Sequence, residues 1–495
     1  MTTQSTITRA TLGVLALGVL ALALLTHGGL LQAGLPLGDY ALLRPFTQHE
    51  TLQVLTGPWA PPESGLGAYY RPLAAMLYGG LFDLLGVHAS WLHAIVLLEL
   101  AALAWLAAIL VARDSAPRTG LLVAAVLIFY PRLPATVTHT AGAIGQLTAM
   151  VLTLLCLLRW QTVRHDQRLL RWWPIFAMIG LGAFLREDMV MLAPALLALQ
   201  WITAVRDRNA PRPNIAVVAG AVAALVGVAA IRLAAYPHLT ATAAGVPFAT
   251  TAPQAFVGLH RVFLFGHSAA GLVATTAALG LTVAGAWSVF QDRRNGLTQT
   301  FIMGAVLFVA ASVPLAADPG SSDARLPLLL LAAALMVAAG AGLLAERLPE
   351  GAPRVAALVA IAVLFGWSQR VVAHDLITPC TAIAIPPVDG HVEDWMSAQA
   401  RACASGLPQP ISDVLPAMQW GAGPRRVLWL ARDTTTVTFA LTPPLNLESD
   451  VDVQVDVDGA SHTAKLRPGT LTRLTYHLRP SPLLAVRGGH WLDLR

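Results

Sequence analysis

The stretch TLGVLALGVLALALLTHGGLL, Thr11–Leu31, contains no acidic residue and no arginine or lysine. A helix of about 20 consecutive apolar residues is long enough to cross the hydrocarbon core of a bilayer. The stretch is too long for the apolar region of a secretory signal peptide, and no small-residue cleavage site follows it. It therefore predicts an uncleaved first membrane span.

Apolar blocks of similar length recur along most of the chain. The protein has 495 residues, of which 56% are hydrophobic and 12% are charged, and its mean hydropathy is +0.63. This composition favours a polytopic α-helical membrane protein over an unusually apolar soluble one. The net charge of +5 does not indicate a nucleic-acid ligand, because the basic residues lie in short loops between the apolar blocks.

The arginines indicate how the chain crosses the bilayer. Loops rich in arginine alternate along the sequence with loops that hold fewer, and cytoplasmic loops carry the excess of basic residues in membrane proteins. Starting from a cytoplasmic N-terminus, this pattern predicts about 11 spans, with the C-terminal segment on the outer side. The arginine-rich loops hold Arg9, Arg113, Arg118, Arg159, Arg164, Arg168, Arg171, Arg206, Arg208, Arg212, Arg293, Arg294, Arg347 and Arg354.

The opposite ends of the predicted spans carry a mixed set of acids, arginines and histidines. Any one of them fits an ordinary interface charge whose side chain reaches the headgroups. Because the set comes from several helices and gathers on one face, we interpret it as a polar site that opens outward. Its members are Asp39, Arg71, Arg132, Arg186, Glu187, Asp188, Arg232, His260, Arg261, Asp323 and Arg325.

Glu99 does not belong to either end. It falls in the middle of the apolar run HAIVLLELAALAW, His93–Trp105. A carboxyl group at this depth must be neutral, paired or solvated. Three interpretations stay open: Glu99 is protonated, it pairs with a neighbour such as His93, or it lies deeper in the same outward cavity.

Several segments together resemble a known family. An early acid in LPLGDYALLRPF (Leu35–Phe46) is followed by YYRPL (Tyr69–Leu73), then by WLHAI (Trp91–Ile95) and by a span that ends in VARDS (Val111–Ser115). This order resembles the polytopic GT-C glycosyltransferases, especially the group akin to protein O-mannosyltransferases. YYRPL is the most specific of these matches.

Three further segments match the family more loosely, so that the resemblance covers roughly residues 10–345. They are FYPRLPATVTHTAGAIGQL (Phe129–Leu147), FLREDMVMLAP (Phe184–Pro194) and DARLPLLLLAAAL (Asp323–Leu335). The chain also departs from the family pattern. Asp39 stands alone where many relatives carry paired acids, and Ala135 and Ala143 stand where the family has Glu and Arg, which leaves the donor sugar and the acceptor open.

The resemblance implies an activity and assigns residues to it. It implies an inverting transfer of a sugar from a polyprenyl-phosphate donor to an acceptor on the outer face, with Asp39 as the base that activates the acceptor. Arg325 and Arg71 are expected to bind the donor phosphate, since a guanidinium offers a planar fork of donors to phosphate oxygens. The expected sugar or acceptor contacts are Tyr70, His139, Arg186, Glu187, Asp188 and Asp323.

Each assignment has a structural alternative that the residues leave open. Asp39 fits a turn or helix cap in LGDY, Arg325 fits an ion pair with Asp323, and Arg71 fits a brace on helix carbonyls. Arg186 fits a local pair with its acidic neighbours, and His139 fits a polar side chain between helices. No cofactor is expected, because a monophosphate leaving group needs no metal on chemical grounds, and no acids or histidines show metal-ligand spacing.

Composition changes near residue 369, which predicts a transmembrane domain over residues 1–369 and an extracytoplasmic β-rich domain over residues 370–495. Four short segments there, RRVLWLA, TTTVTFALT, DVDVQVDV and RLTYHLR, predict strands of a β-sandwich-like fold, and Asp458-Gly459 predicts a hairpin turn. The aspartates of DVDVQVDVD share one strand face, which favours a solvated surface over a calcium site. Cys380 and Cys403 both fall in this segment, where a disulfide is plausible.

Two rival functions remain from the sequence. A transporter or lipid flippase would show internal repeats and polar groups near the midplane, and Glu99 alone fits that description. An inactive membrane scaffold that presents the β domain is the other. The chain holds a single lysine among many arginines, which suggests a bacterium with GC-rich DNA. The predicted location is therefore the inner membrane, with the C-terminal domain in the periplasm.

Overall fold

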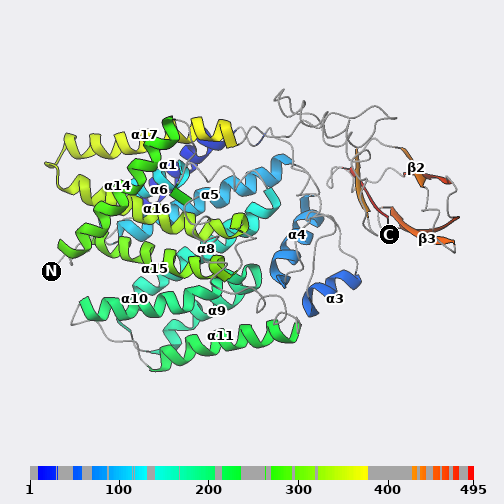
Figure 1. Cartoon of the computed structure of the whole chain (residues 1–495), viewed down its shortest axis with the longest axis horizontal. Helices are drawn as coiled ribbons and strands as arrows, with labels where there is room; N and C mark the ends of the chain where they lie inside the picture. The colour runs from blue at the N-terminus through cyan, green and yellow to red at the C-terminus, as the bar shows by residue number, and fades with distance from the viewer. Residues whose placement is uncertain are drawn as a thin grey trace.

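The structure is a computed structural model (Figure 1). The described residues are 9–28, 31, 48–57, 70–85, 89–113, 115, 117–130, 140–166, 168–206, 215–235, 262–263, 269–291, 296–317, 322–376, 426–431, 435–441, 450–457, 460–467, 472–478 and 489–494.

Helices make up the described residues as far as Leu376, and strands follow from Arg426 onward. In chain order the helices are α1 (Arg9–His27), α3 (Gln48–Thr56), α4 (Pro72–Leu85), α5 (Ala89–Ala112), α6 (Pro117–Ile128), α8 (Thr140–Val163), α9 (Leu169–Leu185), the 3-10 helix η2 (Glu187–Met191), α10 (Leu192–Arg206), α11 (Ile215–Ala235), α14 (Ala269–Gln291), α15 (Gly296–Ala317), α16 (Ser322–Glu346) and α17 (Ala352–Leu376).

Within the described residues, 7 helices are long and apolar enough to cross a membrane. Their spans are Ser90–Ala112, Ala143–Val163, Asp188–Arg206, Ala269–Gln291, Gly296–Val313, Leu328–Glu346 and Ala352–Arg370. Shorter apolar helices cover Leu12–His27, Pro72–Leu85, Pro117–Ile128, Leu169–Leu185 and Val217–Ile231. The chain is thus mostly helical and has the make-up of a multi-pass membrane protein. The total of about 11 spans stays a prediction, since it requires most of the shorter helices to cross as well.

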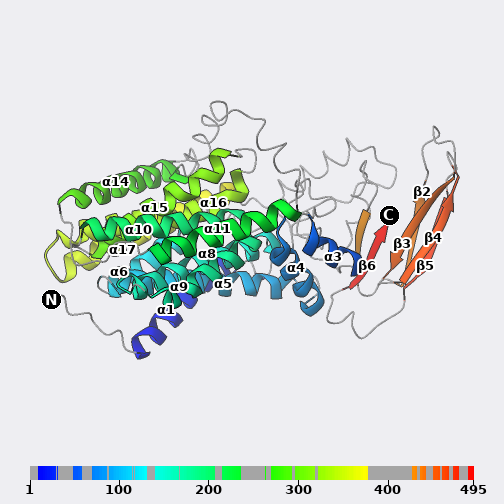
Figure 2. The ribbon, with the colours of Figure 1, turned by 90° about the horizontal axis from the view of Figure 1, so that it is seen from below.

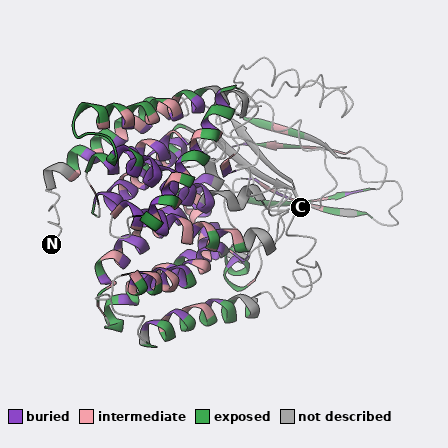
Figure 3. Ribbon diagram, turned by 60° about the vertical axis from the view of Figure 1, so that its left-hand side comes forward, coloured by how far each residue is buried: buried purple, intermediate pink, exposed green. Residues whose placement is uncertain are grey.

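Helix α16 forms the centre of the bundle. Of its most apolar window, 94% is buried inside the protein, against 22% for α17. Figure 3 shows the same contrast, with buried residues on the inner helices and exposed ones on helices at the edge of the bundle. A helix that is apolar on every side and covered by other helices is what a central span requires.

Glycines let the neighbouring helices approach α16 at backbone distance. A side chain at Gly340 would overlap the carbonyl of Leu281 on α14, and one at Gly304 on α15 would lie 2.9 Å from the carbonyl of Ala332. Membrane helices associate through close packing at such small residues, because apolar side chains gain no hydrophobic free energy when they leave lipid for another helix. The crossing of α14 and α16 therefore depends on Gly340.

Hydrogen bonds join the helix ends that carry the arginine-rich loops. Arg113, just after α5, donates from Nη1 to the carbonyl oxygen of Leu158 on α8 at 3.2 Å. Gln200 on α10 donates from Nε2 to the carbonyl oxygen of Arg164 at 2.6 Å and accepts from Trp160 Nε1 at 3.1 Å. The ends of α5, α8 and α10 thus lie together, as the alternation of arginine-rich loops predicts.

The opposite end of the bundle carries α3 and α4. Both views draw these two helices, and the C-terminal strands beyond them, on that side of the molecule (Figures 1 and 2). The strands are β1 (Arg426–Ala431), β2 (Thr436–Leu441), β3 (Val451–Val457), β4 (Ala460–Leu466), β5 (Thr472–His477) and β6 (Gly489–Leu494).

The strands form two antiparallel sheets, a 4-stranded one in the order β1-β6-β3-β4 and a 2-stranded one made of β2 and β5. Val455 and Val457 of β3 are buried with Leu478, and Val437 and Leu474 from the second sheet pack against them. Asp452 is exposed on the other face of β3, so the alternation read in DVDVQVDV is confirmed. The apolar face of one sheet therefore covers the other, as in a sandwich.

Four of the strands fall where the sequence predicts them, namely β1, β2, β3 and β5. Val457 pairs with Ala460, which confirms a tight hairpin, although Asp458 and Gly459 themselves lie outside the described residues. Cys380 and Cys403 also lie outside them, and Cys156, within α8, is a free buried thiol. The domain boundary between residues 369 and 370 stays a prediction, and α17 continues past it to Leu376.

We expect Gly340→Ala to destabilise the bundle by about 1–3 kcal/mol, because the added methyl group must push α14 away from α16. Gly180→Ala is the matched control, since a side chain at Gly180 would meet nothing within 4 Å. Thermal unfolding of the purified protein in detergent measures both. An unchanged unfolding temperature for Gly340→Ala would contradict the close crossing of α14 and α16.

Candidate functional site

Within the segment YYRPL, Tyr70 and Arg71 lead into α4, and Tyr70 connects this helix to two others. Pro72 occupies the first helical position, which proline favours because its fixed φ suits the helix and it has no N–H to leave unpaired. The Tyr70 hydroxyl, just before it, donates to the carbonyl oxygen of Leu55 on α3 at 3.0 Å. The buried ring of Tyr70 meets Phe184 of α9 edge-on, with centroids 6.1 Å apart. Tyr70 thereby fixes α4 against both neighbours.

Arg71 lies next to Tyr70 and is half-buried. Its carbonyl oxygen accepts from the Ala75 amide at 3.1 Å, so its backbone belongs to the first turn of α4. A guanidinium held at a helix entry near a predicted interface suits an anion that approaches from the headgroup region.

Arg186 and Asp188 form a buried ion pair where α9 ends. Arg186 Nε and Nη2 donate to the two carboxylate oxygens of Asp188 at 3.0 and 2.8 Å. The side chains are 6% and 4% exposed, so solvent screens this pair little. The structure therefore supports the local-pair interpretation of Arg186, and it does not bear on a substrate contact.

The local backbone explains why these two side chains meet. Arg186 is extended (φ −150°, ψ 133°) between α9 and η2, and its carbonyl oxygen accepts from the Met189 amide at 3.2 Å. Met189 folds back over Gly182, where a side chain would lie 2.6 Å from its methyl group. Gly182 thus makes room for the turn of η2 that brings Asp188 beside Arg186.

The structure brings two of the predicted segments to one end of the bundle. Phe184, which meets Tyr70, is two residues from Arg186, so YYRPL and FLRED lie side by side although they are far apart in sequence. This end lies opposite the arginine-rich helix ends. Four of the predicted residues, Tyr70, Arg71, Arg186 and Asp188, therefore belong to two segments that are in contact through Tyr70 and Phe184.

The remaining assignments stay predictions. Asp39 and His139 lie outside the described residues. Glu187 belongs to η2, and Asp323 and Arg325 belong to the first turn of α16, but their side chains are not described. Among the described residues, no group of three or more His, Cys, Asp or Glu side chains could hold a metal ion.

Glu99 lies inside the bundle and pairs with a threonine. Thr148 Oγ1 on α8 donates to Glu99 Oε1 at 2.7 Å, and the same hydroxyl lies 2.8 Å from the carbonyl oxygen of Ile144. The second carboxyl oxygen, Oε2, is buried and makes no hydrogen bond within the part of the chain that the structure describes. The observed hydrogen bond joins α5 to α8. The sequence analysis named His93 as an example of a pairing neighbour and did not identify Thr148.

A second polar group that the sequence did not reveal joins α1, α6 and α17. Gln369 Nε2 donates to the carbonyl oxygen of Ile128 at 3.2 Å, and His27 Nε2 lies 3.1 Å from the same oxygen. Both side chains are buried. The available signal was that His27 and Gln369 are among the polar residues that follow two apolar runs, which identifies neither partner. This contact fixes the helix that leads into the C-terminal segment.

Comparisons of the chain with protein-family models, with curated proteins and with solved structures find no match. The resemblance to GT-C glycosyltransferases therefore depends on the quoted segments alone.

We expect Asp188→Ala to lower the free energy of unfolding by about 3–5 kcal/mol, because it leaves the Arg186 guanidinium buried without its counter-ion. Replacing both residues, as in Arg186→Met with Asp188→Leu, should recover much of this loss. Glu350→Ala is the control, since Glu350 is 86% exposed and its pair with Arg354 spans 3.7 Å. Thermal unfolding in detergent measures all three. Equal losses for the single and the double variant would contradict a buried pair.

Proposed function

We propose that the protein is an inverting membrane glycosyltransferase that uses a polyprenyl-phosphate-linked sugar. The observation that carries this proposal is the meeting of YYRPL and FLRED, through Tyr70 and Phe184, at one end of the bundle. These are two of the segments on which the family resemblance depends, and they are far apart in sequence. Their contact is what a shared substrate site would require.

The chemistry of the donor suits this end of the bundle. A polyprenyl chain must lie in the hydrocarbon of the bilayer, while its sugar phosphate must stay near the headgroups. A site formed by helix ends satisfies both demands. The buried pair of Arg186 and Asp188 would keep the backbone at this end ordered for a substrate.

We assign the steps of transfer as follows. Asp39 removes the proton of the acceptor hydroxyl as its oxygen bonds to the anomeric carbon of the sugar. The bond from that carbon to the phosphate oxygen breaks, and polyprenyl phosphate leaves on the opposite face, so the configuration inverts. Arg325 and Arg71 stabilise the charge that builds up on the departing phosphate. Tyr70, His139, Glu187, Asp188, Arg186 and Asp323 surround the sugar or the acceptor.

The proposed topology has about 11 spans, with the arginine-rich loops in the cytoplasm. On this basis residues 1–369 form the GT-C-like domain, and residues 370–495 form a sandwich-like domain in the periplasm of a bacterium. The acceptor is a glycan, lipid or protein that reaches the outer face. The strands that follow α17 lie on the side of the bundle that carries α3 and α4, which is consistent with this arrangement.

A transporter or flippase is the second candidate, because Glu99 is the feature that glycosyl transfer does not use. A carboxyl group within a span is expensive and commonly marks the path of an ion or a polar substrate. Its hydrogen bond to Thr148 across two helices gives it a defined position. Glycosyl transfer remains the favoured proposal, because two of the segments that hold its predicted residues are in contact, whereas Glu99 lies on α5 and bonds to α8.

We expect Asp39→Asn to reduce transfer about 10²–10⁴-fold, because a positioned base contributes on that order. Asp83→Asn is the control, since Asp83 is an exposed carboxylate on the neighbouring helix α4. The measurement is the release of polyprenyl phosphate from a set of radiolabelled polyprenyl-phosphate sugars by membranes that contain each variant. Full activity of Asp39→Asn would overturn the assignment of the base.

We expect gently purified protein to retain a polyprenyl-phosphate sugar, and Arg325→Ala to lose it, because the guanidinium binds the phosphate through charge-assisted hydrogen bonds. Native mass spectrometry detects the adduct, and its mass gives the class of sugar. Arg113→Ala, at the opposite end of the bundle, should retain the adduct. Retention of ordinary phospholipid alone, even after polyprenyl-phosphate sugars are added, would favour a transporter or a scaffold.

A further inference from the structure

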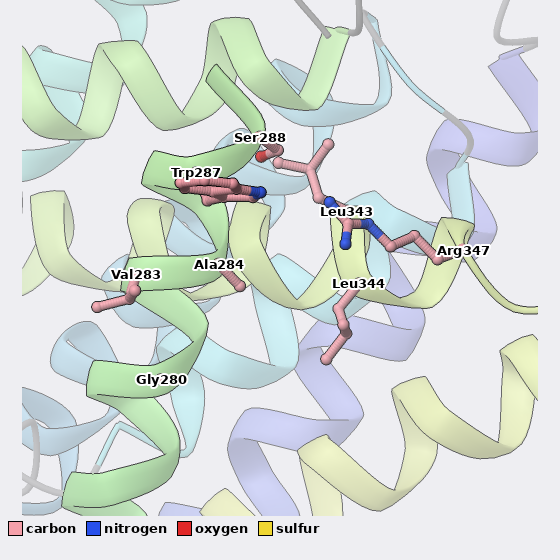
Figure 4. A pocket seen from close by; sticks show the side chains of 8 residues that line it. All are labelled: Gly280, Val283, Ala284, Trp287, Ser288, Leu343, Leu344 and Arg347. Carbon is pink, nitrogen blue, oxygen red and sulfur yellow. The ribbon is translucent and has the colours of Figure 1, made fainter. Parts of the chain in front are cut away.

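A groove of about 280 Å³ lies between α14 and α16 near the arginine-rich end of the bundle. The two helices touch where Gly340 meets the carbonyl of Leu281, and the groove opens along the following turns of both. Figure 4 shows the side chains that surround it. They are Val283, Ala284, Trp287, Ser288, Leu343, Leu344 and Arg347, together with Gly280.

The groove opens on the side of the bundle, away from its core, and its lining is almost entirely apolar. Val283 is 67% exposed, Trp287 60% and Leu344 47%. Gly280 widens it, because a side chain there would meet nothing within 4 Å. On a soluble protein such a surface would be a liability, but on a span of a membrane protein it faces the hydrocarbon of the bilayer. A flexible hydrocarbon chain is the occupant that this lining fits.

The polar end of the groove is formed by Arg347. Its Nη2 donates to Gln291 Oε1 at 2.9 Å, which holds the guanidinium in place while other N–H donors of the group remain for a second acceptor. Figure 4 shows this guanidinium pointing from α16 toward Trp287 on α14. A tryptophan and an arginine at one level of a span are typical of the boundary between hydrocarbon and headgroups. The groove thus has an apolar part along Gly280 and Val283 and a cationic end at Arg347.

We propose that this groove binds an anionic phospholipid, with an acyl chain along Gly280, Val283 and Leu344 and the phosphate on Arg347. The loops that follow α8, α10 and α14 hold more arginines than acids, which gives this side of the bundle a basic character and favours a lipid with net negative charge. A zwitterionic lipid also carries a phosphate, but its own ammonium group competes with Arg347. The site is at the far end of α16 from Arg325, so it does not depend on the proposed transfer of sugar.

The test measures the binding of phosphatidylglycerol and phosphatidylcholine to the full chain by native mass spectrometry after delipidation in detergent. We expect the wild type to bind one phosphatidylglycerol about tenfold more tightly than phosphatidylcholine, as one charge-assisted hydrogen-bonded contact allows. Arg347→Ala should lose this preference, whereas Gly280→Leu, which fills the groove, should weaken both lipids. Gly227→Leu is the matched control and should change neither, because Gly227 is an equally open glycine on α11.

Three results would overturn the proposal. An unchanged preference in Arg347→Ala would remove the assigned phosphate ligand, and unchanged binding in Gly280→Leu would remove the groove. A wild-type dimer that Gly280→Leu dissociates would instead identify the groove as a contact between two copies of the chain. Both variants change exposed positions, so their unfolding temperatures should match that of the wild type, and this separates a lost site from a lost fold.

Discussion

The close approach of backbones at Gly340 and Gly304 is the constraint on which the rest of the bundle depends. It lets the backbones of α14 and α15 approach the backbone of α16 closely, and α16 lies at the buried centre of the domain. Association of membrane helices relies on such packing, because apolar side chains gain little from leaving lipid. The same two helices, α14 and α16, line the groove beside Arg347.

Polar contacts are distributed between the two ends of the bundle in different ways. At the arginine-rich end, side chains such as Arg113 and Gln200 donate to backbone carbonyl oxygens of a neighbouring helix or of the turn that follows it. At the other end, Arg186 and Asp188 satisfy each other in a buried pair. The first arrangement ties helices together, whereas the second neutralises two charges inside the protein where α9 ends.

Local patterns predicted the helices and most of the strands, because burial of one face or of a whole helix leaves a periodic signal. Strand β4 was missed because most of its residues are exposed, so ASHTAKL shows no clear alternation. The partner of Glu99 was also missed. Thr148 lies on α8, and which residue of α8 faces Glu99 is set by the register of packed helices, which one sequence does not reveal. The Arg186–Asp188 pair was accessible because its members are two residues apart.

Two glycines of the same helix pair have opposite consequences. At Gly340 the backbone of α14 occupies the space that a side chain would fill, and this contact stabilises the bundle. At Gly280 the missing side chain leaves a space that no atom of the described residues fills within 4 Å. A helix pair cannot stay in backbone contact along its whole length, because straight helices that cross must diverge on either side. The groove beside Arg347 is thus a geometric result of the tight crossing, and lipid is the material available to fill it.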